Sequence, residues 1–433
     1  ERRGFDVVVG NPPYVRNSGI VDFKAFFQAT FVDFHSGSAD LYIYFIAQGI
    51  KSLHNDGLLG FIVANKWLRA DYAAPMRESL PRVARPVELL DFAHSNVFPG
   101  TDTFPCILIV ARCNTEESQP DLRFADVSDR TRGTMPLAKY VADHAFDVPI
   151  TALRRDGWFL EPSGVIDLLT HLQADFSSLS EWPGAESLHF GVLTGFNEAF
   201  YVDTSMRNRL VADDPNCEPL LHKLLRGRTV RRWSPAWNGE WMIGIPSSAN
   251  QSWPWSVCDD ESVAENIFQT TYPTIYAHLK PFEASLRRRE SRGRFWWELR
   301  SCDYYDAMIK PKIVVQQILY HSVFAFDNDA YWTNQTVYFF PSDDLYLLAI
   351  LNSRIIWWYM YRIWPHKKDE ALSVQKPAFL ALPIPNPSAD LRKCIESLVR
   401  QALACTRIGE SVSLSLEEEL HAAVVEAYGL SAT

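Results

Sequence analysis

The sequence predicts an α/β region, then an irregular α+β region, then a small helical region. Three observations indicate this order. Short apolar runs alternate with helix-like segments over residues 5–111. From about Asn114, short strands, turns, prolines and tryptophans predominate, and beyond Pro387 apolar residues again recur at helical spacing. Such alternation is typical of an α/β sheet. We expect parts at 1–113, 114–385 and 386–433.

The first element is the β-branched run 5–9, closed by Gly10, which predicts a buried parallel strand. Helical spacing over 40–53 predicts a helix with Asp40 as its N-cap and a stop at 55–57. The remaining elements of this region are a helix over 72–80 and strands over 58–64, 87–92 and 106–111. Together they predict a mostly parallel sheet.

Later in the chain, helices are expected over 391–404 and 416–428. The composition, with 47% hydrophobic and 22% charged residues, is typical of a globular protein. No apolar run reaches the roughly 18 residues of a membrane span and no signal segment is evident, so we expect no membrane association and a cytoplasmic location. The 7 cysteines form no C-x-x-C pair, so neither a disulfide framework nor a metal site is expected.

Chemistry is indicated by Asn11-Pro12-Pro13-Tyr14, which follows the first strand directly. Ligands of open α/β sheets bind at the carboxyl ends of strands. The Asn11 side-chain oxygen and the Pro12 carbonyl can accept both N–H groups of an adenine amine, which aims the nitrogen lone pair at an electrophilic methyl group. The prolines fix φ and donate no N–H, and Tyr14 offers a face for a flipped base. The alternative is a tight turn after a strand.

At these residues the chain resembles the amino-methyltransferases that use S-adenosylmethionine. Further motifs resemble the type IIG restriction–modification methyltransferases over nearly the whole chain: Asp40-Leu41-Tyr42, Asn65-x-Trp67-Leu68, Val97-Phe98-x-Gly100, Gly191-Val192-x-Thr194-Gly195, Leu225-Arg226-Gly227-Arg228 and Leu382-Pro383-Ile384-Pro385. The resemblance implies an incomplete Rossmann-like methyltransferase sheet, a target-recognition domain and a helical tail. It also implies DNA adenine-N6 methylation, double-stranded DNA as the partner and Phe104 as a candidate for stacking on the flipped base, although core packing of Phe104 is an equal alternative.

The cofactor motif of such enzymes is missing from these residues. A glycine-rich turn normally holds the cofactor, yet no two of the 20 glycines are separated by a single residue. We therefore expect the main S-adenosylmethionine motif in an upstream portion of the same polypeptide, beside which a nuclease domain is an option. These residues alone are expected to be inactive.

Two basic clusters are candidates for DNA contact within this acidic chain of net charge -10. Arginine can bind phosphates or guanine edges, and the aromatic residues 295–297, which are interleaved with the second cluster, can stack on bases. The alternative is a solvated face of Glu–Arg pairs. The candidates are Lys223, Arg226, Arg228, Arg231, Arg232, Arg287, Arg288, Arg289, Arg292 and Arg294.

Two rival functions stay open. One is a DNA-recognition module without activity in isolation. The other is an RNA or protein N-methyltransferase, because such enzymes share the Asn-Pro-Pro-Tyr loop. The arginine- and tryptophan-rich region that follows the loop favours DNA over these compact enzymes.

Overall fold

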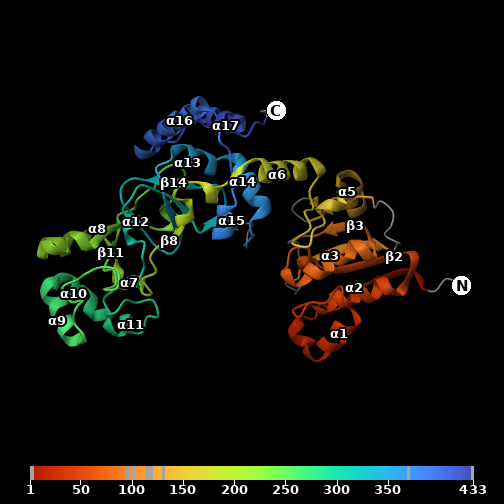
Figure 1. Cartoon of the computed structure of the whole chain (residues 1–433), viewed down its shortest axis with the longest axis horizontal. Helices are drawn as coiled ribbons and strands as arrows, with labels where there is room; N and C mark the ends of the chain where they lie inside the picture. The colour runs from red at the N-terminus through yellow and green to blue at the C-terminus, as the bar shows by residue number, and fades with distance from the viewer. Residues whose placement is uncertain are drawn as a thin grey trace. The chain divides into compact units, whose positions relative to one another are not determined.

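The computed structural model describes residues 4–93, 95, 97–98, 103–112, 120–128, 132–367 and 371–430. The motif residue Gly100 and the expected boundary near Asn114 lie outside the described residues. The chain forms two compact units, the N-terminal unit Glu1–His171 and the C-terminal unit Leu172–Thr433 (Figure 1). No helix of the described residues has both the length and the hydropathy to cross a membrane. The three-part division expected from the sequence stays a prediction.

A six-stranded sheet organises the N-terminal unit, in the order β1-β2-β4-β3-β5-β6 (Figure 1). Its strands are β1 (Phe5–Gly10), β2 (Leu53–Ala64), β3 (Arg85–Asp91), β4 (Pro105–Ala111), β5 (Leu122–Asp126) and β6 (Phe146–Val148). β1 is parallel to β2, and β3 is parallel to β5. β4 is antiparallel to both of its neighbours, and β5 and β6 are antiparallel. The expectation of a mostly parallel sheet is met only in part: β1, β2, β3 and β5 run in one direction, and β4 and β6 run in the opposite one, which makes the sheet mixed.

Among the described residues, this unit contains the helices α1 (Lys24–Thr30), α2 (Leu41–Ser52), α3 (Ala74–Val83) and α5 (Leu137–His144). α6 (Ser163–Asp175) spans the junction between the units. α2 packs on β2, and α3 packs on β3. The core between them is apolar and includes Ile43, Ile46, Leu59, Val63 and Leu108. Burial of this surface stabilises the layer by roughly 25 cal/mol per Å² of apolar area.

Strand β1 differs from the sequence expectation in its burial. Phe5, Val7 and Val9 are 64%, 57% and 79% exposed. β1 lies at the edge of the sheet, where only β2 pairs with it among the described strands. Its parallel pairing is as expected, but the prediction of a buried strand is wrong, because Phe5, Val7 and Val9 share one face of the sheet and that face is uncovered at this edge strand. An apolar edge strand of this kind is a surface on which another strand can pair.

The C-terminal unit contains two four-stranded sheets, β15-β10-β11-β9 and β14-β12-β16-β8, and two short ribbons, β13-β17 and β18-β7. The strands are β7 (Ser177–Ser178), β8 (His189–Phe190), β9 (Tyr201–Asp203), β10 (Leu221–Leu225), β11 (Glu240–Ile243), β12 (Lys312–Gln316), β13 (Ile318–Leu319), β14 (Phe324–Asp327), β15 (Trp332–Thr333), β16 (Val337–Pro341), β17 (Leu372–Ser373) and β18 (Pro383–Ile384). Lys312 of β12 and Asp327 of β14 face each other in register as a fully buried ion pair.

Helices surround these sheets. They are α7 (Asn197–Phe200), α8 (Thr204–Asp213), α9 (Glu261–Thr271), α10 (Pro273–Leu279), α11 (Glu283–Arg287), α12 (Tyr305–Met308), α13 (Leu345–Leu351), α14 (Arg354–Ile363), α15 (Lys376–Leu380), α16 (Ala389–Arg407) and α17 (Leu414–Ala427). The last two match the predicted helical tail and begin at serine N-caps, Ser388 and Ser413. α16 packs on α13 and α17 within the same unit.

The aromatic residues near the second basic cluster lie inside the protein. Phe295, Trp296 and Trp297 are buried, and Trp297 stacks on Phe268 at 5.0 Å between ring centroids. Trp255 approaches Trp297 edge-on. These rings therefore belong to the core, and the expectation that they stack on bases is wrong.

Candidate active-site loop and nucleic-acid interface

The Asn-Pro-Pro-Tyr loop begins at the carboxyl end of β1. β4 is antiparallel to β2 and β3, so the carboxyl ends of β1, β2 and β3 lie at the same edge as the amino end of β4. We call this the loop edge. The pairing of Ala64 with Pro105 and of Asp91 with Cys106 brings the strand ends together there. Ligand sites of α/β sheets form at such an edge.

The loop presents Asn11 to solvent and keeps Pro12 inside. Asn11 and Pro13 are exposed, Pro12 is buried and Tyr14 is half-buried. The Tyr14 hydroxyl donates to the Ile62 carbonyl at 3.4 Å. Burial, and secondarily the proximity of Cys106, raise the pKa of Tyr14, so its ring stays neutral at physiological pH. Among the described residues, no hydrogen bond to the Asn11 side chain is formed, so its oxygen is available as an acceptor.

The start of the loop packs closely on a neighbouring ring. Gly10 pairs with Phe61 of β2, and a Cβ at this position would lie 3.0 Å from the Phe61 ring. A larger residue would push the ring or the strand aside, because contacts this close are repulsive. Gly10 therefore lets β1 lie close to β2 where the catalytic candidates begin.

The end of the loop is held by the start of α2. The Asn17 backbone N–H donates to Asp40 Oδ1 at 2.8 Å, and the Leu41 N–H donates to the Val15 carbonyl at 3.0 Å. Asp40 occupies the N-cap position, as predicted, but its side chain makes no capping hydrogen bond. Its carboxylate instead binds the backbone three residues beyond Tyr14, so the Asp-Leu-Tyr motif anchors the loop.

Polar groups from the other strands join the loop edge. Asn65, directly after β2, donates from Nδ2 to Asp91 Oδ1 at 2.9 Å and to the Ala93 carbonyl at 3.3 Å. Its backbone N–H donates to the Phe104 carbonyl at 2.8 Å, which places half-buried Phe104 at this edge. Burial raises the pKa of Asp91 despite the hydrogen bonds from Asn65 and Ala93, which lower it.

Sequence reasoning did not single out Asp91 or the anchoring role of Asp40. The available signal was position, because Asp91 is a polar residue at the end of an apolar strand. Trp67, by contrast, is fully buried and packs edge-on against Trp158 at 4.8 Å. It is a scaffold residue and does not line the loop edge.

The first basic cluster begins within β10, at Lys223, and continues beyond that strand in the C-terminal unit. Lys223 lies over the rings of Trp237 and Tyr331, at 5.1 and 5.8 Å. Arg226 and Arg228 share one carboxylate, Glu240, at 3.1 and 2.9 Å. Burial raises the pKa of Glu240, but hydrogen bonds from Asn238 and the two arginines outweigh it and lower the pKa. These two arginines are thus partly neutralised by Glu240.

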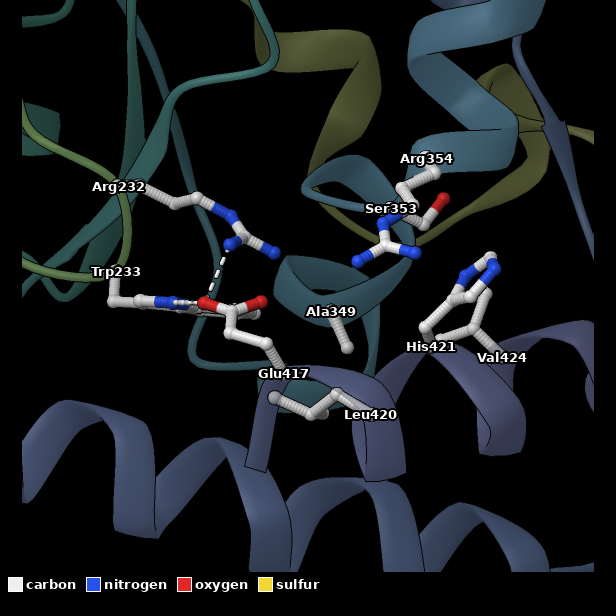
Figure 2. A pocket seen from close by; sticks show the side chains of 9 residues that line it. All are labelled: Arg232, Trp233, Ala349, Ser353, Arg354, Glu417, Leu420, His421 and Val424. Carbon is white, nitrogen blue, oxygen red and sulfur yellow. Dashed lines mark hydrogen bonds and ion pairs between the residues drawn. The ribbon is translucent and has the colours of Figure 1, made fainter. Parts of the chain in front are cut away.

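The last members of this cluster differ from each other. Arg231 is exposed and donates only to the backbone carbonyls of Arg228 and Val230. Arg232 pairs with Glu417 of α17 at 2.5 Å and donates to the Asn352 carbonyl (Figure 2). Glu417 also accepts from Trp233 Nε1 at 3.3 Å. Arg232 therefore fastens the strand region to the helical tail.

A small cavity lies beside this ion pair. Figure 2 shows Arg354 and His421 facing it from α14 and α17. Its volume is about 20 Å³, which is space for roughly one water molecule. It cannot hold a base or a cofactor. The lining residues are Arg232, Trp233, Ala349, Ser353, Arg354, Glu417, Leu420, His421 and Val424.

The second basic cluster begins with two ion-paired arginines. Arg287 contacts Glu283 at 2.8 Å and Glu261 at 2.5 Å. Arg294 donates to the Ser256 and Cys258 carbonyls and pairs with Asp259 at 3.1 Å. These two arginines form pairs with acidic residues, as expected if the cluster is a solvated face of ion pairs and not a DNA contact.

Arg289 lies in the interior of the C-terminal unit. It is 7% exposed, and its guanidinium donates to the carbonyls of Leu286, Thr194, Trp296 and Glu298 at 2.6–3.1 Å. Burial, with Arg292 nearby, lowers the pKa of Arg289 to about 10, which leaves it charged at neutral pH. A side chain that is buried and bound in this way does not reach DNA in this conformation.

Three arginines combine exposure with freedom from ion pairs among the described residues. Arg231, Arg288 and Arg292 are exposed and form no ion pair with any described residue. Arg288, at the C-cap of α11, donates to the Ala284 carbonyl of that helix and to no other described residue through its side chain. Among the ten basic candidates, these three are the ones that are both exposed and not paired with a described carboxylate.

Comparison with known proteins identifies both regions. Residues 1–98 match the Eco57I restriction-modification methylase family, and residues 222–384 match the TaqI-like C-terminal specificity domain. The chain is 25% identical over 364 residues to the type II methyltransferase M.XhoI of Xanthomonas vasicola, covering 80% of this chain and 61% of that protein. It is 24% identical over 369 residues to the type II methyltransferase M.PaeR7I of Pseudomonas aeruginosa, covering 80% and 58%.

A solved structure shares the fold. The type IIL restriction-modification enzyme MmeI, solved in complex with DNA, aligns with a TM-score of 0.51 and 14% identity, over 99% of this chain and 55% of that one. The chain thus spans only part of the length of each of these proteins. Both regions match in the expected order, a restriction–modification methylase of the Eco57I type over residues 1–98 and a TaqI-like C-terminal specificity domain over residues 222–384.

Proposed function

We propose that the protein is a site-specific DNA adenine-N6 methyltransferase of a restriction–modification or phage-defence system. The observation that carries the proposal is the Asn-Pro-Pro-Tyr loop at the carboxyl end of β1, with Asn11 exposed and the loop anchored by Asp40. The match of residues 222–384 to a specificity domain supports DNA as the substrate. The curated relatives are type II methyltransferases, which supports methyl transfer.

The loop residues perform the part of the reaction that this chain can supply. Asn11 Oδ1 and the Pro12 carbonyl accept the two N–H groups of the flipped adenine amine, which favours a pyramidal nitrogen. Tyr14 and Phe104 stack on the base taken out of the duplex. Arg231, Arg288 and Arg292, with the ion-paired members of both clusters, contact DNA phosphates and base edges.

S-adenosylmethionine supplies the electrophilic methyl group in this proposal. The residues of this chain fit the acceptor side of such a site, but they include no G-x-G turn for the nucleoside. The exposed edge of β1 is consistent with further strands that pair there, because apolar edge strands are normally covered. We therefore place the main cofactor motif in an upstream portion of the polypeptide, which can also carry a nuclease domain.

The test is methylation by the full-length polypeptide and its Asn11→Ala variant. Duplex DNA is incubated with methyl-labelled S-adenosylmethionine and then digested to nucleosides for mass spectrometry. Asn11→Ala should reduce turnover by about a hundredfold, the scale of losing one key polar group, with DNA affinity nearly unchanged. Asn55→Ala is the matched control, since Asn55 is exposed near the opposite end of β2. Equal turnover of all three proteins would rule out the proposed role of Asn11.

The two rival functions give different results in the same assay. A DNA-recognition module would bind duplex DNA without transferring methyl groups, even as the full-length polypeptide. An RNA or protein N-methyltransferase would label those polymers in preference to duplex DNA.

A further inference from the structure

Asn65 contacts both ends of the connection between β3 and β4, beside the backbone bond from Phe92 to the Pro105 carbonyl. Where the chain leaves β3, the Asn65 side chain binds Asp91 Oδ1 and the Ala93 carbonyl. Where the chain enters β4, the Asn65 backbone N–H binds the Phe104 carbonyl. This arrangement lies at the loop edge, beside Tyr14, whose hydroxyl binds Ile62 near the end of β2.

The turn after β3 is conformationally unusual. Ala93 has φ of 45°, a left-handed value that residues with a Cβ rarely adopt. Asp91 stabilises the turn, because its Oδ1 accepts the Ala93 N–H at 2.9 Å as well as the Asn65 amide. Backbone conformations of this kind persist where surrounding contacts enforce them, and they concentrate at functional sites.

Asp91 also has an energetic cost. Burial raises its pKa, so the ionised form is less stable in the folded protein than in water. If the side chain at this position only filled space, an uncharged side chain would make the folded protein more stable than the aspartate does. The geometry of the two hydrogen bonds, and not the stability of the fold, is what an aspartate provides at this position.

We propose that Asn65 and Asp91 are positioning residues that set Phe104 against the target base. The proposal rests on the proposed function, since it assigns these residues to the same methyl-transfer site. Asn65 joins the turn after β3 to the carbonyl of Phe104, and Asp91 orients the Asn65 amide. The two side-chain bonds fix the position of Asn65, whose backbone N–H in turn holds the Phe104 carbonyl. Loss of the amide loosens this support of Phe104, although the Phe92 N–H still binds the Pro105 carbonyl and keeps the ends of the connection adjacent.

The test is a double-mutant cycle in the full-length polypeptide, with kcat and KM for duplex DNA measured separately. Asn65→Ala and Phe104→Ala should each lower kcat by about tenfold to a hundredfold, the scale of a misplaced substrate contact, with KM within about twofold of wild type. If Asn65 acts through Phe104, the double variant should be no slower than the slower single variant. Asn55→Ala, which removes an exposed amide of the same kind, should leave both constants unchanged.

Substitutions of Asp91 separate hydrogen bonding from charge. Asp91→Asn keeps an acceptor for Ala93 and Asn65 and should retain most of kcat, whereas Asp91→Ala should resemble Asn65→Ala. Independent, multiplying losses in the double variant would overturn the proposal, as would a kcat of Asn65→Ala within twofold of wild type. So would losses that follow a fall in melting temperature, which would mean a purely structural role. If wild type itself methylates no DNA, the proposed function has failed instead.

Discussion

Replacement of Arg289 by alanine should destabilise the C-terminal unit by about 3–5 kcal/mol. The guanidinium donates to four backbone carbonyls, and each buried acceptor left without a partner costs about 1–3 kcal/mol before water or relaxation offsets part of it. The loss would also separate Thr194 from the segment around Trp296. An effect of this size is at the upper end for a single substitution.

Arg288→Ala is the matched control, because it removes an identical side chain from the adjacent exposed position. It should change stability by no more than about 0.5 kcal/mol, as surface substitutions usually do. Its effect should appear in DNA binding instead, as a fall of about 1 in the slope of log affinity against log salt if Arg288 contacts a phosphate. Urea unfolding followed by tryptophan fluorescence measures stability, and titration with duplex DNA at several salt concentrations measures binding.

Arg289→Ala should therefore lower stability, whereas Arg288→Ala should alter DNA binding and leave stability nearly unchanged. Equal stability of Arg289→Ala and Arg288→Ala would refute the assignment of Arg289 to the interior. A salt slope and affinity unchanged in Arg288→Ala would show that this part of the cluster is a solvated face. A triple variant in which alanine replaces Arg287, Arg288 and Arg289 would not distinguish DNA binding from stability. It removes the buried guanidinium of Arg289 together with the surface charges.

Three further predictions concern other parts of the chain. Lys312→Ala should destabilise the protein by about 3–5 kcal/mol, because it leaves Asp327 charged and buried, and Lys312→Met combined with Asp327→Leu should recover most of that loss in urea unfolding. The raised pKa of Asp91 contributes stability that is complete below its unfolded pKa near 3.8 and is lost as pH rises through the folded pKa. The melting temperature of Asp91→Asn should therefore rise relative to wild type between pH 4 and pH 7; a constant difference would contradict this. Calorimetric titration of these 433 residues with S-adenosylmethionine should show no saturable binding, whereas the polypeptide with its upstream portion should bind; micromolar binding by the 433 residues would contradict the placement of the cofactor motif.

The strands were predictable from the sequence, but their directions were not. The β-branched and apolar runs at 58–64, 87–92 and 106–111 all form strands, because such residues pack well on a pleated surface. β4 inserts antiparallel between β2 and β3, and that choice depends on how the chain returns to the sheet, not on any residue within the strand. The burial of β1 was overestimated for a similar reason, since an apolar run does not show whether its strand has neighbours on both sides.

The residues of the candidate active-site loop were predictable from the sequence, but the contacts that hold the neighbouring residues in place were not. The Asn-Pro-Pro-Tyr loop is recognisable because four adjacent residues have one chemical purpose. Asp91 and Asn65 are 26 residues apart and meet only through the sheet. Arg287, Arg288 and Arg289 have identical side chains, and only tertiary contacts separate them.

The central claim is that this protein methylates adenine in duplex DNA through the Asn-Pro-Pro-Tyr loop. The most direct test is mass spectrometry of nucleosides from DNA treated with the full-length polypeptide and methyl-labelled S-adenosylmethionine. We predict labelled N6-methyladenine with wild type, and about a hundredfold less with Asn11→Ala. Label found on cytosine, or none on DNA with a folded protein that binds the cofactor, would contradict the claim.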